Sequence, residues 1–144
     1  MTSAPPANAF FLQGVAGQLF VMYVQPRRAT AMRRDVILVP PFAEEMNKSR
    51  RMFSLQAHAL AEMGIGTLIP DLYGTGESEG DFGQGRWSIW KNDLAAACAW
   101  LIEQGSRSVS LLGLRLGALL ALDFARQSST ALEKIILWQP VTSG

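Results

Sequence analysis

The chain has 144 residues, 49% of them hydrophobic and 17% charged, and its formal net charge is +1. This balance excludes an intrinsically disordered chain, and the length suffices for one domain with a buried core. The small net charge gives no reason to expect nucleic acid or an acidic membrane surface as a partner. We therefore expect one domain over residues 1–144, with a flexible terminus over residues 1–8.

Cys98 is the only cysteine, so the chain forms no internal disulfide. Its alanine-rich surroundings favour a buried thiol over a reactive one. Residues 1–9 lack the basic start and the apolar run of a signal peptide. No apolar run approaches the roughly 20 residues of a membrane span. These features predict a cytoplasmic protein.

The first half of the chain predicts three short strands and a helix. Strands are predicted over residues 10–13 and 18–24, which flank a glycine turn, and residues 18–24 are rich in β-branched and aromatic side chains. The wholly apolar residues 36–39 are typical of a strand that is buried on both faces. After a loop over residues 40–47, apolar residues recur at helical spacing until Gly64.

The second half continues this alternation of strands and helices. Strands are predicted over residues 66–70, 109–112 and 134–138, and helices over residues 87–104 and 118–126. Strands that alternate with helices indicate right-handed crossovers and a parallel sheet that is covered on both faces. The sequence therefore predicts a three-layer α/β/α fold with a mostly parallel sheet.

Four arginines, Arg27, Arg28, Arg33 and Arg34, flank the turn before the strand at residues 36–39. Charged side chains are seldom buried without a partner. We interpret this basic cluster as a solvated loop.

Unusual residues follow the predicted parallel strands. In open α/β sheets, ligands bind beyond the carboxyl ends of the strands, where loops lead into helices. In this chain those loops contain residues 40–45, 71–78 and 113–117, and the last predicted strand ends at Gln139. We expect a functional site where these loops meet.

The sharpest pattern is Gly113-x-Arg115-x-Gly117, which lies between a strand and an apolar helix. Small residues on either side of the apex allow the strand and helix backbones to approach closely. The apex residue, Arg115, is then pushed outward, commonly with a strained positive φ.

This turn resembles the nucleophile elbow, Gly-x-Ser-x-Gly, of the α/β-hydrolase superfamily. The resemblance extends to residues 71–78, which read Asp-x-x-Gly-x-Gly-x-Ser, and to Pro40-Pro41-Phe42, where an oxyanion loop would lie. It implies two further strands after residues 134–138. The chain is therefore expected to be a partial α/β-hydrolase fold that lacks the C-terminal strands.

Residues 40–48, 71–82 and 113–118 together are similar to the exosortase A system-associated hydrolase 2 family. The resemblance runs along nearly all of the chain, and the members of that family are longer. It implies a bacterial cytoplasmic protein encoded beside exopolysaccharide and exosortase (PEP-CTERM sorting) functions. The resemblance implies an acyl or ester hydrolase by classification, but it defines no substrate.

Two features depart from hydrolase chemistry. Arginine stays protonated and accepts no hydrogen bond, so Arg115 cannot act as a nucleophile or a general base. Superfamily members place the catalytic acid and histidine after the nucleophile, but only Asp123 and Glu133 are acidic there and no histidine follows. His58 precedes the turn and is expected to be a surface or packing residue. We expect little or no activity from this chain alone.

Two interpretations of Arg115 remain open. As a bidentate donor beside a helix N-terminus, it would bind a carboxylate or a phosphate. Alternatively, it forms an ion pair with Glu44, Glu45 or Asp71, because a buried guanidinium without a carboxylate is costly. The residues expected to line the site are the following: Phe42, Glu44, Glu45, Asp71, Leu116 and Gln139.

Other conspicuous residues have structural interpretations. Gly74, Gly76 and Gly80 are expected to form turns, and no Gly-Lys-Ser/Thr follows them as in a phosphate loop. Trp87 and Trp90 are more typical of helix packing than of a ligand platform. Ser78 is expected to belong to a loop. One histidine and one cysteine at unrelated positions predict no metal site, and no cofactor is expected.

Three hypotheses follow. The chain is part of an enzyme whose other catalytic groups lie in a further segment, a catalytically silent binding or scaffold protein, or a fragment without independent activity. The strand at residues 134–138 is expected to be an unprotected edge beside an uncovered apolar face. We therefore expect self-association, or a partner that covers this edge.

Overall fold

A computed structural model describes residues 7–28, 30–42 and 44–139, without the side chains of Glu44 and Glu45. The described strands form one six-stranded sheet in the order β1-β2-β4-β3-β5-β6. The antiparallel strands are β1 (Ala7–Gln13) and β2 (Gln18–Val24), and β2 also pairs antiparallel with β4. The parallel strands are the following: β3 (Arg34–Val39), β4 (Ile65–Pro70), β5 (Ser108–Leu114) and β6 (Ile135–Trp138).

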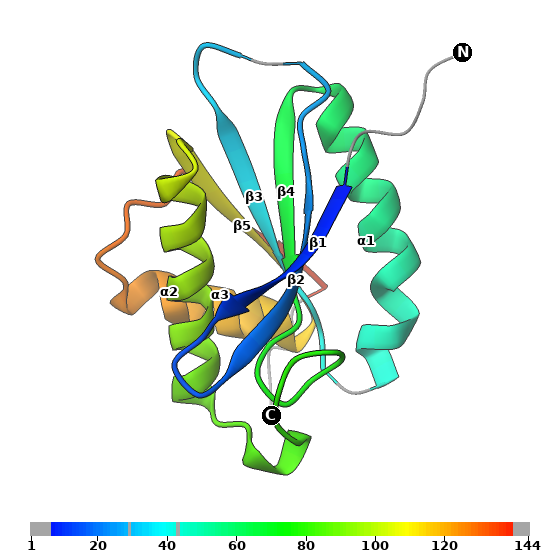
Figure 1. Ribbon diagram of the computed structural model, residues 1–144, viewed down its shortest axis with the longest axis vertical. Helices are drawn as coiled ribbons and strands as arrows, with labels where there is room; N and C mark the ends of the chain where they lie inside the picture. Colours follow the sequence, from blue (N-terminus) through cyan, green and yellow to red (C-terminus); the bar gives the residue numbers. More distant parts are fainter. Residues whose placement is uncertain (1–6, 29, 43, 140–144) are drawn as a thin grey trace.

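Three α-helices cover the two faces of this sheet (Figure 1). The helix α1 (Glu44–Glu62) packs on one face, and α2 (Trp87–Glu103) and α3 (Leu116–Gln127) pack on the other. A short 3₁₀ helix, η1 (Phe82–Gln84), lies in the connection between β4 and α2. The predicted three-layer α/β/α fold with a mostly parallel sheet is confirmed.

The central strand β3 shows why its apolar run belongs at this position. Ile37 and Val39 join the core beneath α2 and α3, whereas Val36 and Leu38 join the core beneath α1. Successive side chains of a strand point to opposite faces, so a strand with helices on both sides must be apolar throughout.

Three differences from the predicted element boundaries concern the N-terminal stretch and the loops of the candidate site. β1 begins at Ala7, inside the stretch 1–8 that was expected to be flexible, and residues 1–6 lie outside the description. The helix α1 begins at Glu44, so Glu44 and Glu45 start a helix and do not belong to a loop. Acidic residues are favourable in a first helical turn. The helix α3 begins at Leu116, directly after Arg115.

The interpretation of the basic cluster as a solvated loop is wrong for Arg33. Its Nε donates to Asp35 at 3.2 Å, and its two terminal nitrogens donate to Tyr23 Oη at 2.8 Å and to the Gln104 carbonyl at 2.6 Å. Asp35 is only 1% exposed, so it needs this cation close by. Arg28 and Arg34 are exposed, as predicted.

The strand β6 forms one edge of the described sheet, and its apolar side chains are exposed. Ile136 is 45% exposed, and Leu119 and Leu122 on the adjacent α3 are 41% and 38% exposed. In the part of the chain that the structure describes, no helix has both the length and the apolarity needed to span a bilayer.

Candidate functional site

The turn between β5 and α3 is as tight as the glycine spacing predicts. A Cβ atom on Gly113 would lie 2.5 Å from Ala118 Cα. A Cβ on Gly117 would lie 2.4 Å from the Val39 carbonyl oxygen, at the end of β3. Real Cβ atoms do not approach other atoms this closely, so only glycine lets α3 start directly against the strand ends.

Arg115 occupies the apex of this turn, with φ 59° and ψ −122°. The prediction of a positive φ at this residue is therefore confirmed. Its N–H donates to the Trp138 carbonyl at 3.0 Å, and its carbonyl accepts from the Ala118 N–H at 3.0 Å. These two bonds fix the apex to the end of β6 and to the first turn of α3. The side chain is half-buried.

Asp71 follows β4 and organises the loop that was predicted to wall the site. One carboxylate oxygen, Oδ2, accepts from the Glu77 N–H at 2.9 Å, and Ser78 Oγ donates to the Asp71 carbonyl at 2.6 Å. Gly76 has φ 50°, and a Cβ there would lie 2.1 Å from Asp71 Oδ2. Ser78 also accepts from the Phe20 N–H at 2.8 Å. The serine thus belongs to a loop, as predicted.

The structure places Arg50 of α1 beside Asp71. Its Nη2 lies 3.4 Å from Asp71 Oδ2. Both side chains line a cavity of about 160 Å³, whose other walls include Phe20, Pro40 and Met46. The sequence analysis missed Arg50. The available signal was its spacing of four residues from Met46, which puts both on one face of α1.

Phe42 also lies near this end of the sheet. Its ring contacts the Trp90 ring, with centroids 4.4 Å apart and planes tilted by 35°. Trp90 in turn donates from Nε1 to the Tyr73 carbonyl at 2.9 Å. Trp90 is 9% exposed, so the interpretation of this tryptophan as a packing residue is confirmed. Phe42 has the same exposure and belongs to the core beneath α2 and α3.

The remaining predicted site residues have different outcomes. Leu116 is half-buried and packs against the core, and Gln139 is exposed with φ 46°. The side chains of Glu44 and Glu45 lie outside the described part of the chain, so an ion pair between either of them and Arg115 stays a prediction. The loop residues Asp71 and Phe42 lie at the same end of the sheet as Arg115.

Two other reactive side chains lie away from this end. His58 is half-buried on α1, one turn before the helix ends beside the start of β4. Cys98 is fully buried in the core, and this burial raises the pKa of its thiol to about 12. The prediction of an unreactive, buried cysteine is confirmed. Over residues 7–28, 30–42 and 44–139, no group of His, Cys, Asp and Glu side chains is arranged to hold a metal ion.

Asp93 of α2 is the buried acid that the sequence analysis missed. Its side chain is 0% exposed, and Oδ2 accepts from the Tyr73 N–H at 2.9 Å. Its Oδ1 has no hydrogen-bond partner among the described residues. Burial raises the pKa of this carboxyl to about 6, although the Tyr73 hydrogen bond opposes the shift. The sequence did contain a signal for this burial, because Asp93 directly precedes Leu94, which belongs to the apolar face of the predicted helix.

Comparisons with known proteins agree with this geometry. Residues 30–144 match the model of the family described as serine aminopeptidase, S33. No curated protein matches the chain. Among solved structures, an α/β serine hydrolase homologue from Coxiella burnetii is 23% identical with a TM-score of 0.75, over 95% of this chain and 64% of that one.

Two further structures have the same fold. Est1E from Butyrivibrio proteoclasticus, solved with ferulic acid, is 20% identical with a TM-score of 0.82, over 92% of this chain and 53% of that one. An α/β serine hydrolase without a lid from Xanthomonas campestris is 25% identical with a TM-score of 0.72, over 87% of this chain and 59% of that one. The chain therefore spans between half and two thirds of the length of these structures.

The buried carboxyl of Asp93 predicts a specific dependence of stability on pH. The pKa is about 6 in the folded chain and about 3.9 in an unfolded chain. Between these values the folded state binds more protons, so the free energy of unfolding falls as the pH rises from about 4 to about 6. Asp93→Asn removes this fall, and at pH 7 it should be about 1–3 kcal/mol more stable than the wild type.

Urea denaturation at pH 4, 5, 6 and 7 measures this effect. Asp123→Asn is the matched control, because the Trp87 hydrogen bond and Lys91 lower the pKa of that half-buried carboxyl. The control should lose stability relative to the wild type at pH 7. Parallel pH profiles for the wild type and Asp93→Asn would show that the buried carboxyl carries no penalty.

Proposed function

The chain belongs to the serine aminopeptidase S33 family, and we propose that it is a non-catalytic member that binds a carboxylate or a phosphate at Arg115. The observation that carries the proposal is the position of this arginine. It stands at the apex of a strained turn between β5 and α3, where the sequence pattern of the superfamily has its nucleophile. A guanidinium at that position cannot attack a carbonyl group.

The surroundings of Arg115 favour binding of an anion. The turn leads directly into α3, a helix of 12 residues. The first N–H groups of a helix have no partner within the helix, and its dipole favours negative charge there. A guanidinium adds a planar pair of donors that matches a carboxylate or a phosphate. Phe42, Asp71, Leu116 and Gln139 are proposed to line this site, with Glu44 and Glu45 at its edge.

A second candidate is a hydrolase of which this chain supplies one part. The chain covers 64%, 53% and 59% of the three solved structures described above, so a further segment would supply the catalytic acid, the histidine and any nucleophile. Arg115 would still occupy the place of the nucleophile in such a protein. The observation in its favour is the family match itself, which is to a family of enzymes.

The proposed setting of the protein follows from the sequence resemblance. We propose a cytoplasmic protein associated with a bacterial exosortase and exopolysaccharide system. We also propose self-association, or a partner protein, at the β6 edge. The exposed side chains of Ile135, Ile136 and Leu137 support an apolar contact at that edge.

Thermal unfolding in sulfate tests the anion site. A ligand that binds only the folded state raises its stability, by about 1.4 kcal/mol at ten times the dissociation constant. For a domain of this size, that corresponds to roughly 3–6 °C in Tm. Sulfate also stabilises folded proteins in general, so it should raise the Tm of the wild type by this amount more than that of Arg115→Ala. Chloride at equal ionic strength corrects for ionic strength.

Arg107→Ala is the matched control for this experiment, because Arg107 is an exposed arginine at the opposite end of β5. It should retain the full sulfate response. Equal sulfate responses in Arg115→Ala and the wild type would contradict the proposed site and leave the ion-pair interpretation.

Hydrolysis of 4-nitrophenyl acetate tests whether this chain is catalytic on its own. We expect the wild type to hydrolyse this ester at the background rate, because Arg115 supplies no nucleophile. Arg115→Ser should be little better, since no histidine follows it in the sequence to act as its base. A rate at least a hundredfold above background in the wild type, lost in Arg115→Ala, would favour the hydrolase.

A further inference from the structure

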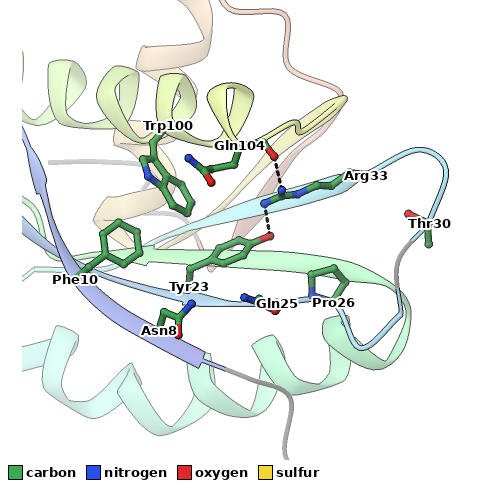
Figure 2. Close-up of a pocket in the computed structure, with 9 residues that line it drawn as sticks. All are labelled: Asn8, Phe10, Tyr23, Gln25, Pro26, Thr30, Arg33, Trp100 and Gln104. Carbon is green, nitrogen blue, oxygen red and sulfur yellow. Dashed lines mark hydrogen bonds between the residues drawn. The ribbon is translucent and has the colours of Figure 1, made fainter.

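A second cavity lies at the opposite end of the sheet from Arg115, beside the amino ends of the parallel strands. It has a volume of about 790 Å³ and lies between β1, β2 and the last turns of α2 (Figure 2). Ligand sites commonly have volumes of roughly 300–1,000 Å³. The residues that line it come from segments that are far apart in the sequence, from Asn8 to Gln104. We call this cavity the amino-end cleft.

Three aromatic rings form one wall of the amino-end cleft. The Phe10 and Trp100 ring centroids are 4.9 Å apart, and the Tyr23 and Trp100 centroids are 5.4 Å apart with nearly perpendicular planes. Asn8 and Tyr23 are paired residues of β1 and β2, and Phe10 is paired with Val21. This register puts the rings of Phe10 and Tyr23 on the face that α2 covers, where both meet Trp100. Phe10 and Trp100 remain half-buried, so part of each ring is accessible.

Arg33 supplies the only formal charge among the nine described residues that line the amino-end cleft. Its hydrogen bonds to Asp35, to Tyr23 Oη and to the Gln104 carbonyl use one N–H on each nitrogen. Because a guanidinium has five N–H groups, one remains on each terminal nitrogen. The side chain is 29% exposed, so solvent and ligands can reach it.

The network behind Arg33 holds its guanidinium in place. Tyr23 Oη donates to Asp35 Oδ1 at 2.5 Å, and Asp35 is buried. The hydrogen bond to Asp35 raises the pKa of Tyr23, in addition to the larger effect of burial. The phenol therefore stays protonated and keeps donating to the carboxylate. A cation fixed in this way pays little entropy when it binds a ligand.

The remaining polar side chains of the cleft are neutral. Asn8, Gln25 and Gln104 contribute amides that both donate and accept hydrogen bonds. No acidic residue is among the nine described lining residues. The carboxylate that pairs with Arg33, that of Asp35, is buried behind it and does not line the cleft. An anion in the cleft would therefore gain a charge-assisted hydrogen bond from Arg33.

We propose that the amino-end cleft is a binding site for a planar aromatic acid. The aromatic part of the ligand stacks on Trp100 and Phe10, and its carboxylate accepts from the free N–H groups of Arg33. This site is independent of the site proposed at Arg115, which lies beyond the other ends of the same strands.

The four tryptophans make the proposal testable by NMR. The probe is 2-naphthoate, added to the ¹⁵N-labelled chain while the indole N–H signals are recorded. Trp100 reports on the amino-end cleft. Trp87 and Trp90 donate to Asp123 and to the Tyr73 carbonyl at other positions, and Trp138 belongs to β6. We expect a saturable shift of the Trp100 signal, and no comparable shift of the Trp138 signal.

Variants and a neutral probe identify the contacts. Phe10→Leu should weaken binding of 2-naphthoate about fivefold, and Arg33→Gln about tenfold, as the loss of one ring contact and of one charge-assisted hydrogen bond predicts. The neutral 2-naphthamide should bind the wild type about tenfold more weakly than 2-naphthoate does. It should bind Arg33→Gln and the wild type with the same affinity, because it carries no charge for Arg33 to recognise. Arg34→Gln is the matched control, because exposed Arg34 pairs with Glu133 and does not line the cleft. It should bind 2-naphthoate like the wild type.

Two results would overturn the proposal. One is the absence of a Trp100 shift at millimolar 2-naphthoate, and the other is a shift confined to Trp138, which would place the probe on the apolar β6 edge. Arg33→Gln leaves Asp35 buried without its cation, so the Trp90 and Trp138 signals must confirm that this variant is folded. If it is unfolded, Phe10→Leu and the comparison of the two probes still decide the outcome.

Discussion

The close approach of α3 to the ends of β3 and β5 is the constraint on which the candidate site depends. Gly113 and Gly117 leave no room for a Cβ atom against Ala118 and the Val39 carbonyl. The residue between them must therefore turn sharply, and Arg115 adopts φ 59° and ψ −122°. Side chains other than glycine seldom adopt this conformation, and it costs of order 1–3 kcal/mol. The fold accepts this cost at the point where the loops after the parallel strands meet.

The loop after β4 is fixed by a different set of interactions, centred on Asp71. This carboxylate accepts from the Glu77 N–H and from Arg50, while Ser78 bridges the Asp71 carbonyl and the Phe20 N–H. Asp71 and Ser78 of the motif at residues 71–78 therefore serve to hold the loop in its conformation. Arg115 stands at the apex of a neighbouring turn at this end of the sheet, and its guanidinium cannot form an acyl intermediate.

The two ends of the sheet differ in character. At the carboxyl ends lie the strained turn at Arg115 and the loop that Asp71 organises. At the amino ends, Phe10, Tyr23 and Trp100 form an aromatic wall beside a guanidinium that a buried network holds in place. The two ends are separated by the length of the parallel strands. The hydrogen bonds, charges and cavity at one end therefore do not depend on those at the other end.

The sequence predicted most of the fold, because apolar periodicity is a local property. The strand at residues 18–24 and the helix stop at Gly64, with φ of 83°, follow from such local patterns. The turn at Arg115 was predictable because steric crowding acts within a few residues.

The roles of Arg33, Arg50 and Asp93 were not predictable in the same way. Each depends on a partner more than 15 residues away along the chain: Arg33 bonds to Gln104, Arg50 to Asp71 and Asp93 to Tyr73. Which face of a helix meets which loop is decided by tertiary packing, and a pattern of residue types carries little of that information. The basic cluster before β3 illustrates the point, because Arg33 and its exposed neighbour Arg34 look alike in the sequence.

The most direct test of the central constraint compares the free energies of unfolding of Arg115→Gly and Arg115→Ala. Both variants lack the guanidinium, so the difference between them isolates the backbone. At an ordinary position alanine is the more stable by about 0.5–1 kcal/mol, but at a strained positive φ the order reverses. We predict that Arg115→Gly is more stable than Arg115→Ala by at least about 1 kcal/mol in urea denaturation. An alanine variant as stable as the glycine variant would contradict the strained turn from which the candidate site is built.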